Sequence, residues 1–378
     1  MSKLESVTLS GFKSIDSEGQ TVDFGDITVF IGANGAGKTN FISFFEMLGY
    51  MADGDLELYT NRNGSASSIL HHGHNETPLI SAELSFSDMA YDYYRFKLAQ
   101  EGDIFIFTEE ELGYRSGLFN REQLEPLEPK TINLGTGHKE SKIWEKIPED
   151  SFSDRISFYI LLGSYYFFQF HDTPRETRMR NSLDCDHVYK GDDASNLASK
   201  LITMSNNPET NKYYRRIVSR INAVFPQFED FVLEPSKHNP NQIILKWKDK
   251  ESQYTFGSHQ ISDGTLRFMA LATLLLQPPE WLPKVIIIDE PELGLHPTAI
   301  SRLAGMVKSA SRHVQVILAT QSPRLLDEFE PNQIVVVDYN DKLKRSEFKK
   351  LKDSDLTEWL DRYTLSELWD KNVIEGNP

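Results

Sequence analysis

Apolar and polar positions follow two different periods near the start of the chain. Apolar residues alternate with polar ones over Leu4–Phe12 and again over Val22–Ile31, which is typical of β-strands with one buried face. The segment Asn40–Met51 instead has apolar residues at helical spacing, namely Phe41, Phe44, Phe45 and Leu48. The pattern therefore predicts strand, strand, glycine-rich turn and helix, in that order.

Similar patterns continue in the second half of the chain. Gln242–Trp247 and Gln253–Phe256 predict a hairpin, Gly264–Leu276 predicts a helix, and Val285–Ile288 predicts a fully buried strand. Strands and helices then alternate as far as Val337, and a mixed helical tail follows. Alternation of this kind is typical of an α/β fold.

The segments between these halves set the expected domain organisation. Residues 53–77 are rich in Gly, Ser, Asn and His. This composition predicts a mobile loop excursion before two strands, over Leu79–Phe86 and Tyr94–Leu98. From about 151 to 228 the pattern is helical without a heptad repeat, with clear helices over 196–204 and 213–225. We therefore expect an N-terminal lobe (1–150), an inserted helical lid (151–240), a C-terminal lobe (241–340) and a tail (341–378).

Composition narrows the class of protein. The 378 residues are 39% hydrophobic and 25% charged, and no apolar run reaches the roughly 20 residues of a membrane span. The start has no export signal, so we expect a soluble, cytoplasmic protein with no membrane partner. The single cysteine, Cys185, excludes an intrachain disulfide. The net charge of −16 means that any contact with nucleic acid must be local.

A phosphate-binding loop follows the second predicted strand. The residues are Gly32, Ala33, Asn34, Gly35, Ala36, Gly37, Lys38 and Thr39, with Asn40 next in the predicted helix. In a loop of this kind backbone N–H groups wrap the phosphates, the lysine pairs with their charge, and the threonine ligates Mg²⁺. The preceding strand and following helix agree with this interpretation, so we expect ATP and Mg²⁺ as ligands.

Two adjacent carboxylates end the buried strand over Val285–Ile288. This position predicts that Asp289 lies in the outer coordination sphere of Mg²⁺ and that Glu290 polarises the attacking water. Alone, an apolar strand ending in Asp-Glu is a weaker signal. Beside a phosphate-binding loop, the pair predicts nucleotide hydrolysis.

A possible second anion site precedes the predicted helix over Gly264–Leu276. Ser262, Asp263 and Gly264 lie about twenty residues before the acidic strand, and a serine beside the N–H groups of a helix start can bind an anion. Taken alone, the triplet reads more simply as a helix N-cap. One phosphate loop needs no second phosphate site, so this segment calls for another explanation.

The order and spacing of these motifs resemble the RecF-like branch of the ABC-type ATPases, the AAA15 and AAA_21 families, which are related to the ATPase domains of OLD-type and anti-phage defence systems. The resemblance covers almost the whole chain. It implies an α/β ABC-type P-loop NTPase resembling RecF and SMC heads, with a mixed β-sheet core and an inserted small helical lid. It also implies that Ser262, Asp263 and Gly264 complete the active site of the opposite subunit in a two-fold, head-to-tail homodimer or a larger assembly.

The resemblance assigns further residues. Gln321 stands where the family has a switch histidine. A glutamine can orient water or phosphate by hydrogen bonding but cannot relay a proton, so we expect slow hydrolysis with a regulatory role. The resemblance implies that Glu290, Gln321 and Lys38 are the catalytic residues. Lys13 and Ser14 match a segment that contacts nucleotide phosphates in SMC-like and RecF-like ATPases. Gln169 or His171 matches a nucleotide-sensing loop, so Gln169 joins Thr39 and Asp289 as an expected metal ligand.

Two functions remain open at this stage. Related proteins often act beside nucleases or TOPRIM proteins, and no nuclease motif follows Gln321, so a sensor ATPase that regulates a separately encoded effector in anti-phage defence is expected. The alternative is a RecF-like DNA-binding ATPase in DNA repair. Two basic clusters bear on DNA binding: Lys342, Lys344, Arg345, Lys349, Lys350 and Lys352, and Lys212, Arg215, Arg216 and Arg220.

Overall fold

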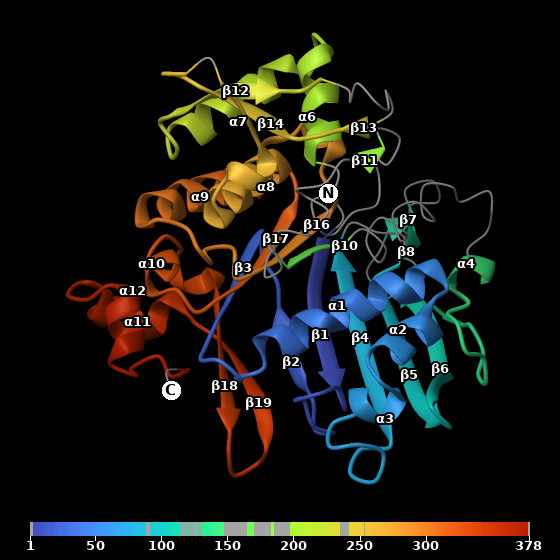
Figure 1. Ribbon diagram of the computed structural model, residues 1–378. Helices are drawn as coiled ribbons and strands as arrows, with labels where there is room; N and C mark the ends of the chain where they lie inside the picture. The colour runs from blue at the N-terminus through green and yellow to red at the C-terminus, as the bar shows by residue number, and fades with distance from the viewer. Residues whose placement is uncertain are drawn as a thin grey trace. The chain divides into compact units, whose positions relative to one another are not determined.

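The computed structural model of the chain is shown in Figure 1. It describes residues 3–87, 91–114, 119–120, 125–126, 130–146, 165–169, 183–184, 197–234, 242–252 and 254–376. The chain forms two compact units. Unit 1 comprises residues 1–165, 331–363 and 367–378, and unit 2 comprises 166–330 and 364–366. The end of the chain thus returns to the unit that contains its start.

An antiparallel sheet forms much of unit 1, with the order β2-β1-β4-β5-β6-β9. Its strands are β1 (Lys3–Ser10), β2 (Gln20–Asp23), β4 (Leu79–Ser87), β5 (Tyr93–Glu101), β6 (Ile104–Tyr114) and β9 (Lys130–Asn133). Helix α1 (Lys38–Asp53) lies along this sheet in Figure 1, and the ring of its Phe44 stacks on Phe96 of β5. The predicted strands over 4–12, 79–86 and 94–98 and the predicted helix over 40–51 are confirmed.

A second group of strands in unit 1 joins distant parts of the sequence. It consists of β3 (Ile27–Ile31), which pairs in parallel with β18 (Ile334–Asn340), and β19 (Arg345–Lys350), which pairs antiparallel with β18. Phe30 of β3, Phe41 of α1 and Phe348 of β19 pack together, with ring centroids 5.0–6.2 Å apart. This aromatic cluster fixes β19 beside the start of α1. Helices α11 (Asp353–Leu360) and α12 (Leu365–Asp370) follow.

Two predictions for this part of the chain were wrong. The single strand expected over Val22–Ile31 is two strands, β2 and β3, separated by a turn in which Gly25 N–H donates to Thr28 Oγ1 (3.2 Å). The excursion expected over 53–77 contains α2 (Leu56–Arg62) and α3 (Ala66–Ile69). The carboxylate of Glu140 caps α2 by accepting from Leu56 N–H (2.8 Å) and Glu57 N–H (3.1 Å). A cap so distant in sequence leaves no local signal.

Unit 2 places two buried parallel strands among helices. Strand β16 (Val285–Asp289) lies between β10 (Tyr165–Gln169) and β17 (Gln315–Thr320), and every residue of β16 and β17 is buried, as expected for strands covered on both faces. The accompanying helices are α8 (Asp263–Leu276), α9 (Pro297–Ala310) and α10 (Pro323–Leu326). The predicted helix over 264–276 and strand over 285–288 are confirmed.

The remainder of unit 2 combines helices with a small sheet. Helices α6 (Leu197–Asn206) and α7 (Asn211–Asn222) confirm the two predicted helices, with ends shifted by a few residues. The sheet is β12 (Phe228–Val232), β14 (Lys246–Asp249) and β15 (Thr255–Gly257), and β14 and β15 form the predicted hairpin. The expectation of helix throughout 151–228 was wrong, because β10 and β11 (Leu183–Asp184) lie within it. Along the described residues, no helix is both long and apolar enough to cross a membrane.

The remaining strands and the remaining α-helix of the described residues are short. They are β7 (Phe119–Asn120), β8 (Glu125–Pro126), α4 (Ile143–Lys146) and β13 (Gln242–Ile243).

Candidate active site

The glycine-rich loop of unit 1 connects β3 directly to α1. Gly37 is the N-cap of α1 and has φ 113°, a left-handed conformation that favours glycine. A Cβ atom at Gly37 would also lie 2.0 Å from Ser346 Oγ. The backbone here therefore requires glycine, and the loop delivers its N–H groups at a helix N-terminus, where anions bind.

Lys38 folds back onto this loop. Its side chain is buried, and its Nζ donates to the carbonyl oxygens of Gly32 (2.7 Å) and Ala33 (2.9 Å). The positive charge is thereby held within the loop itself. This is where the sequence predicts the negative charge of the phosphates.

Lys13 and Ser14 lie against the same loop and helix. Lys13 Nζ donates to Ser43 Oγ of α1 (2.8 Å), and burial lowers the pKa of Lys13 although the charge of Glu46 acts to raise it. Ser14 Oγ and Ser346 Oγ are hydrogen-bonded, 2.8 Å apart. Both residues therefore lie beside the P-loop helix, and their contact with a nucleotide stays a prediction.

Two adjacent carboxylates of unit 2, Asp289 and Glu290, lie at the end of β16. Asp289 is buried at the last position of the strand, and Glu290 has φ 46°, with its N–H donating to Ala319 O of β17 (2.8 Å). Gln321 follows β17, and its Nε2 donates to Glu290 Oε1 (2.8 Å). The expected base and the expected switch residue are therefore in direct contact. The amide holds the carboxylate in one orientation, as a general base requires.

Glu292 is a member of this group that our sequence reasoning missed. Its Oε1 accepts from Thr320 Oγ1 (2.5 Å) and from Gln321 N–H (3.4 Å). Burial raises the pKa of Glu292, the hydrogen bonds from Thr320 and Gln321 lower it, and the charge of Glu290 raises it further. Glu292 thus fixes the end of β17 that carries Gln321. A second carboxylate between Pro291 and Leu293, two positions after Glu290, was the available signal.

Ser262 is the N-cap of α8. Its Oγ accepts from Thr265 N–H (3.2 Å) and donates to Thr265 Oγ1 (2.8 Å). Ser262 and the adjacent Asp263 are exposed. The structural interpretation as a helix cap is therefore correct, and the exposed helix start is open to a further partner.

The first turns of α8 contact the loop after Glu290. A Cβ atom at Gly264 would lie 2.0 Å from Gly294 O, and Arg267 Nη1 donates to Leu293 O (2.8 Å). Burial lowers the pKa of Arg267, while the charges of Asp263 and Glu290 act to raise it. The start of α8 is therefore packed directly against the loop that follows Glu290.

The donor set suits a phosphate-bound Mg²⁺. Among the described residues, no three His, Cys, Asp or Glu side chains gather as a metal cage. Mg²⁺ in phosphoryl-transfer sites is ordinarily held by one or two carboxylates together with substrate phosphates, and Asp289 has the chemistry for this role. The expected role of Thr39 as a ligand stays a prediction. Gln169 ends β10, the neighbour of β16, and its side chain lies outside the described part, as do His171 and Cys185.

Comparisons with known proteins agree on the family and the fold. The family model AAA_21, described as "AAA domain, putative AbiEii toxin, Type IV TA system", matches residues 27–327. No curated protein matches the sequence. A solved Smc head bound to the C-winged helix domain of ScpA is 14% identical, with 94% of this chain and 99% of that chain covered and a TM-score of 0.57.

An Smc head domain with an extended coiled coil, derived from Pyrococcus furiosus and bound to the C-terminal domain of ScpA, is 15% identical. The match covers 96% of this chain and 99% of that chain, with a TM-score of 0.56. At such identities these structures show the fold, and they confirm the predicted ABC-type P-loop fold of the SMC-head kind. The chain therefore belongs to the AAA_21 family and has the fold of an ATP-binding ABC-type ATPase.

Proposed function

We propose that the protein binds ATP with Mg²⁺, hydrolyses it slowly, and in doing so regulates a separately encoded effector, such as a nuclease in anti-phage defence. The observation that carries the slow hydrolysis is the 2.8 Å hydrogen bond from Gln321 Nε2 to Glu290 Oε1. A neutral amide at the switch position orients the base without exchanging protons with it. Such a site is better suited to a regulatory ATPase, in which slow hydrolysis limits how long ATP stays bound, than to rapid turnover.

The proposed reaction is in-line attack of water on the γ-phosphate. Glu290 orients the water and takes its proton, the bond from the γ-phosphorus to the bridging oxygen breaks, and ADP and phosphate leave. Lys38 neutralises phosphate charge, and Thr39 and Asp289 would hold Mg²⁺, which withdraws charge from the phosphate oxygens. Ser262 of a second copy stabilises the γ-phosphate.

The exposed groups of unit 2 support a two-fold dimer. Ser262 and Asp263 leave the N-terminus of α8 open, and the side chain of Leu293 in the adjacent loop is 40% exposed. An apolar residue beside an open anion site is what a second copy would cover. We propose that two copies close head to tail around two ATP molecules.

Steady-state ATP hydrolysis by the full chain tests the activity. We expect slow, Mg²⁺-dependent hydrolysis that is lost in Lys38→Ala. If Lys38→Ala hydrolysed ATP at the parental rate, the activity would not come from this loop, and the proposed function would be wrong.

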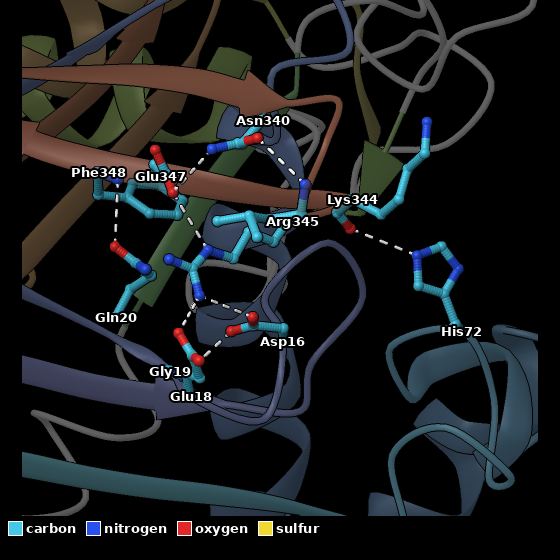
Figure 2. A network of polar contacts seen from close by, with 11 residues as sticks. Asp16, Glu18, Gly19, Gln20, His72, Asn340, Lys344, Arg345, Glu347 and Phe348 are labelled. Atoms are coloured by element: carbon cyan, nitrogen blue, oxygen red, sulfur yellow. Dashed lines mark hydrogen bonds and ion pairs between the residues drawn. The ribbon is translucent and has the colours of Figure 1, made fainter.

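The two basic clusters differ sharply in how their charges are used. In the β18–β19 hairpin, Arg345 is held by Asp16, Glu18 and Glu347, as Figure 2 shows. Lys344 pairs with Asp341 (3.8 Å), and Lys349 pairs with Glu375 (3.1 Å). Three of the six cations of the hairpin cluster are therefore paired with carboxylates of their own unit.

Helix α7 instead has a basic face without internal neutralisation, and this favours nucleic-acid binding as a second candidate function. The exposed side chains of α7 are Lys212, Arg215, Arg216, Ser219 and Arg220. None of its four basic residues forms an ion pair with another described residue, although Arg216 donates to Ser309 Oγ (3.0 Å). A protein interface usually needs an exposed apolar anchor, and this face of α7 has none. Phosphate groups are therefore the favoured partner.

Salt-titrated binding to duplex DNA tests this second function. Arg215→Ala/Arg220→Ala should reduce the salt slope by roughly two, whereas Lys344→Ala/Lys349→Ala, which removes the same charge from ion-paired positions of the hairpin, should change it little. Absence of binding by the parent at low salt would exclude the DNA-binding function.

A further inference from the structure

Two peptide groups of the P-loop are held by residues from the far end of the sequence. Ser346 of β19 is fully buried, and its Oγ donates to Ala36 O (2.6 Å). At the other side of the loop, Ala33 N–H donates to Gly376 O (3.0 Å). Both contacts lie within unit 1, and neither contacting residue belongs to a nucleotide-binding motif.

The segment that carries Gly376 is itself fixed. Ile374 is buried, and Lys349 of β19 pairs with Glu375 (3.1 Å). Gly376 has φ 76°, and a Cβ atom there would lie 2.5 Å from Val336 Cγ1 of β18. A side chain at 376 would therefore have to shift the segment and the carbonyl that receives Ala33 N–H.

Peptide geometry gives these contacts a consequence for phosphate binding. In a trans peptide the C=O and N–H groups point in opposite directions. Because Ser346 holds the carbonyl of Ala36, the N–H of Gly37 in the same peptide points away from β19. Because Gly376 holds the N–H of Ala33, the carbonyl of Gly32 points the other way, where it accepts from Lys38 Nζ (2.7 Å).

We propose that Ser346 and Gly376 are positioning residues of the nucleotide site. Ser346 directs the Gly37 N–H towards the phosphates of ATP, and Gly376 directs the Gly32 carbonyl that holds Lys38. This inference rests on the proposed binding of ATP at the P-loop. It adds the segment 345–376 to that site, although the segment carries no recognised nucleotide-binding motif. A change in that segment alters phosphate affinity while leaving the carboxylates of unit 2 intact.

The test compares Ser346→Ala and Gly376→Ala in the full chain with two matched controls. Ser85→Ala removes a buried hydroxyl from β4, and Gly102→Ala places a side chain at φ 65° with no atom within 4 Å. Each site variant should raise the KM for ATP about tenfold, equivalent to about 1.4 kcal/mol, with kcat within about twofold of the parent. The controls should keep the parental KM.

Several outcomes separate this inference from the proposed function. Parental KM values in folded Ser346→Ala and Gly376→Ala would overturn the inference while leaving the ATPase intact. A roughly tenfold fall in kcat with an unchanged KM would also overturn the inference. A parent that neither binds nor hydrolyses ATP would instead overturn the proposed function. If thermal melting shows that either alanine variant is unfolded, the KM of Ser346→Cys is measured instead. Its thiol is close to the hydroxyl in size but is only a weak donor, so a parental KM in this variant would overturn the inference.

Discussion

The two halves of the proposed mechanism use different chemical groups. In unit 1 the P-loop presents backbone N–H groups, and their directions depend on a left-handed glycine at 37 and on contacts from Ser346 and Gly376. In unit 2 the groups are side chains, Glu290 and Gln321, at the ends of two neighbouring strands. Changes in the first half should therefore alter binding, and changes in the second should alter turnover.

Glu290→Gln should separate the two halves most strongly. Loss of the general base is expected to lower kcat by roughly 10²–10⁴-fold, whereas ATP affinity should remain, because the P-loop is untouched. Rapid-quench turnover and equilibrium binding of a fluorescent ATP analogue measure the two quantities. Hydrolysis at the parental rate would show that Glu290 is not the base.

Lys38→Ala is the reciprocal change in unit 1. Removing the cation from the P-loop should weaken ATP binding by on the order of 10²-fold. Lys13→Ala is the matched variant, since the ammonium of Lys13 is engaged by Ser43 of α1, and a smaller loss is expected. Calorimetry on both variants would contradict this ranking if Lys13→Ala lost more affinity than Lys38→Ala.

Gln321→Ala tests whether the side-chain half depends on orientation. Without the hydrogen bond to Oε1 of Glu290, we expect kcat to fall about five- to tenfold at unchanged KM, consistent with a loss of about 1 kcal/mol. Gln321→Asn, whose shorter amide cannot keep the same reach, should behave like the alanine variant. An unchanged kcat in both would separate Gln321 from catalysis.

The smallest effect expected is on stability, at Glu292. Because burial raises its pKa above the ordinary 4.5, its contribution is fully present below pH 4.5 and is lost as pH rises through the folded-state pKa. Glu292→Gln keeps an acceptor for Thr320 and does not titrate. The Tm of this variant minus that of the parent should therefore increase between pH 4 and 8. Glu280→Gln, at an exposed carboxylate, provides the control, and an equal trend there would contradict the assignment.

The sequence predicted those parts of the site whose chemistry lies in contiguous residues. Glycines before Lys38 and carboxylates at the end of a buried strand are required at fixed spacing, so the sequence alone predicts roles for 32–39 and 289–290. The contacts of Ser346 with Ala36 and of Gly376 with Ala33 join residues more than 300 positions apart, and no local pattern encodes them. The same reason explains the missed cap of α2 by Glu140.

The basic clusters show a similar limit of sequence reasoning. Both had comparable local charge, yet Arg345 in one is enclosed by three carboxylates, whereas α7 in the other has no ion pair among the described residues. Charge patterns predict where cations are, and only the fold shows which of them are already neutralised.

The most direct test of the account is the mass of purified Glu290→Gln in solution, with and without ATP and Mg²⁺. We expect a doubling of mass that requires ATP and disappears when Lys38→Ala is added, because the P-loop of one copy and the exposed start of α8 in the other would close on the same nucleotide. A mass that is unchanged by ATP, in a protein that demonstrably binds it, would contradict the proposal that two copies share each active site.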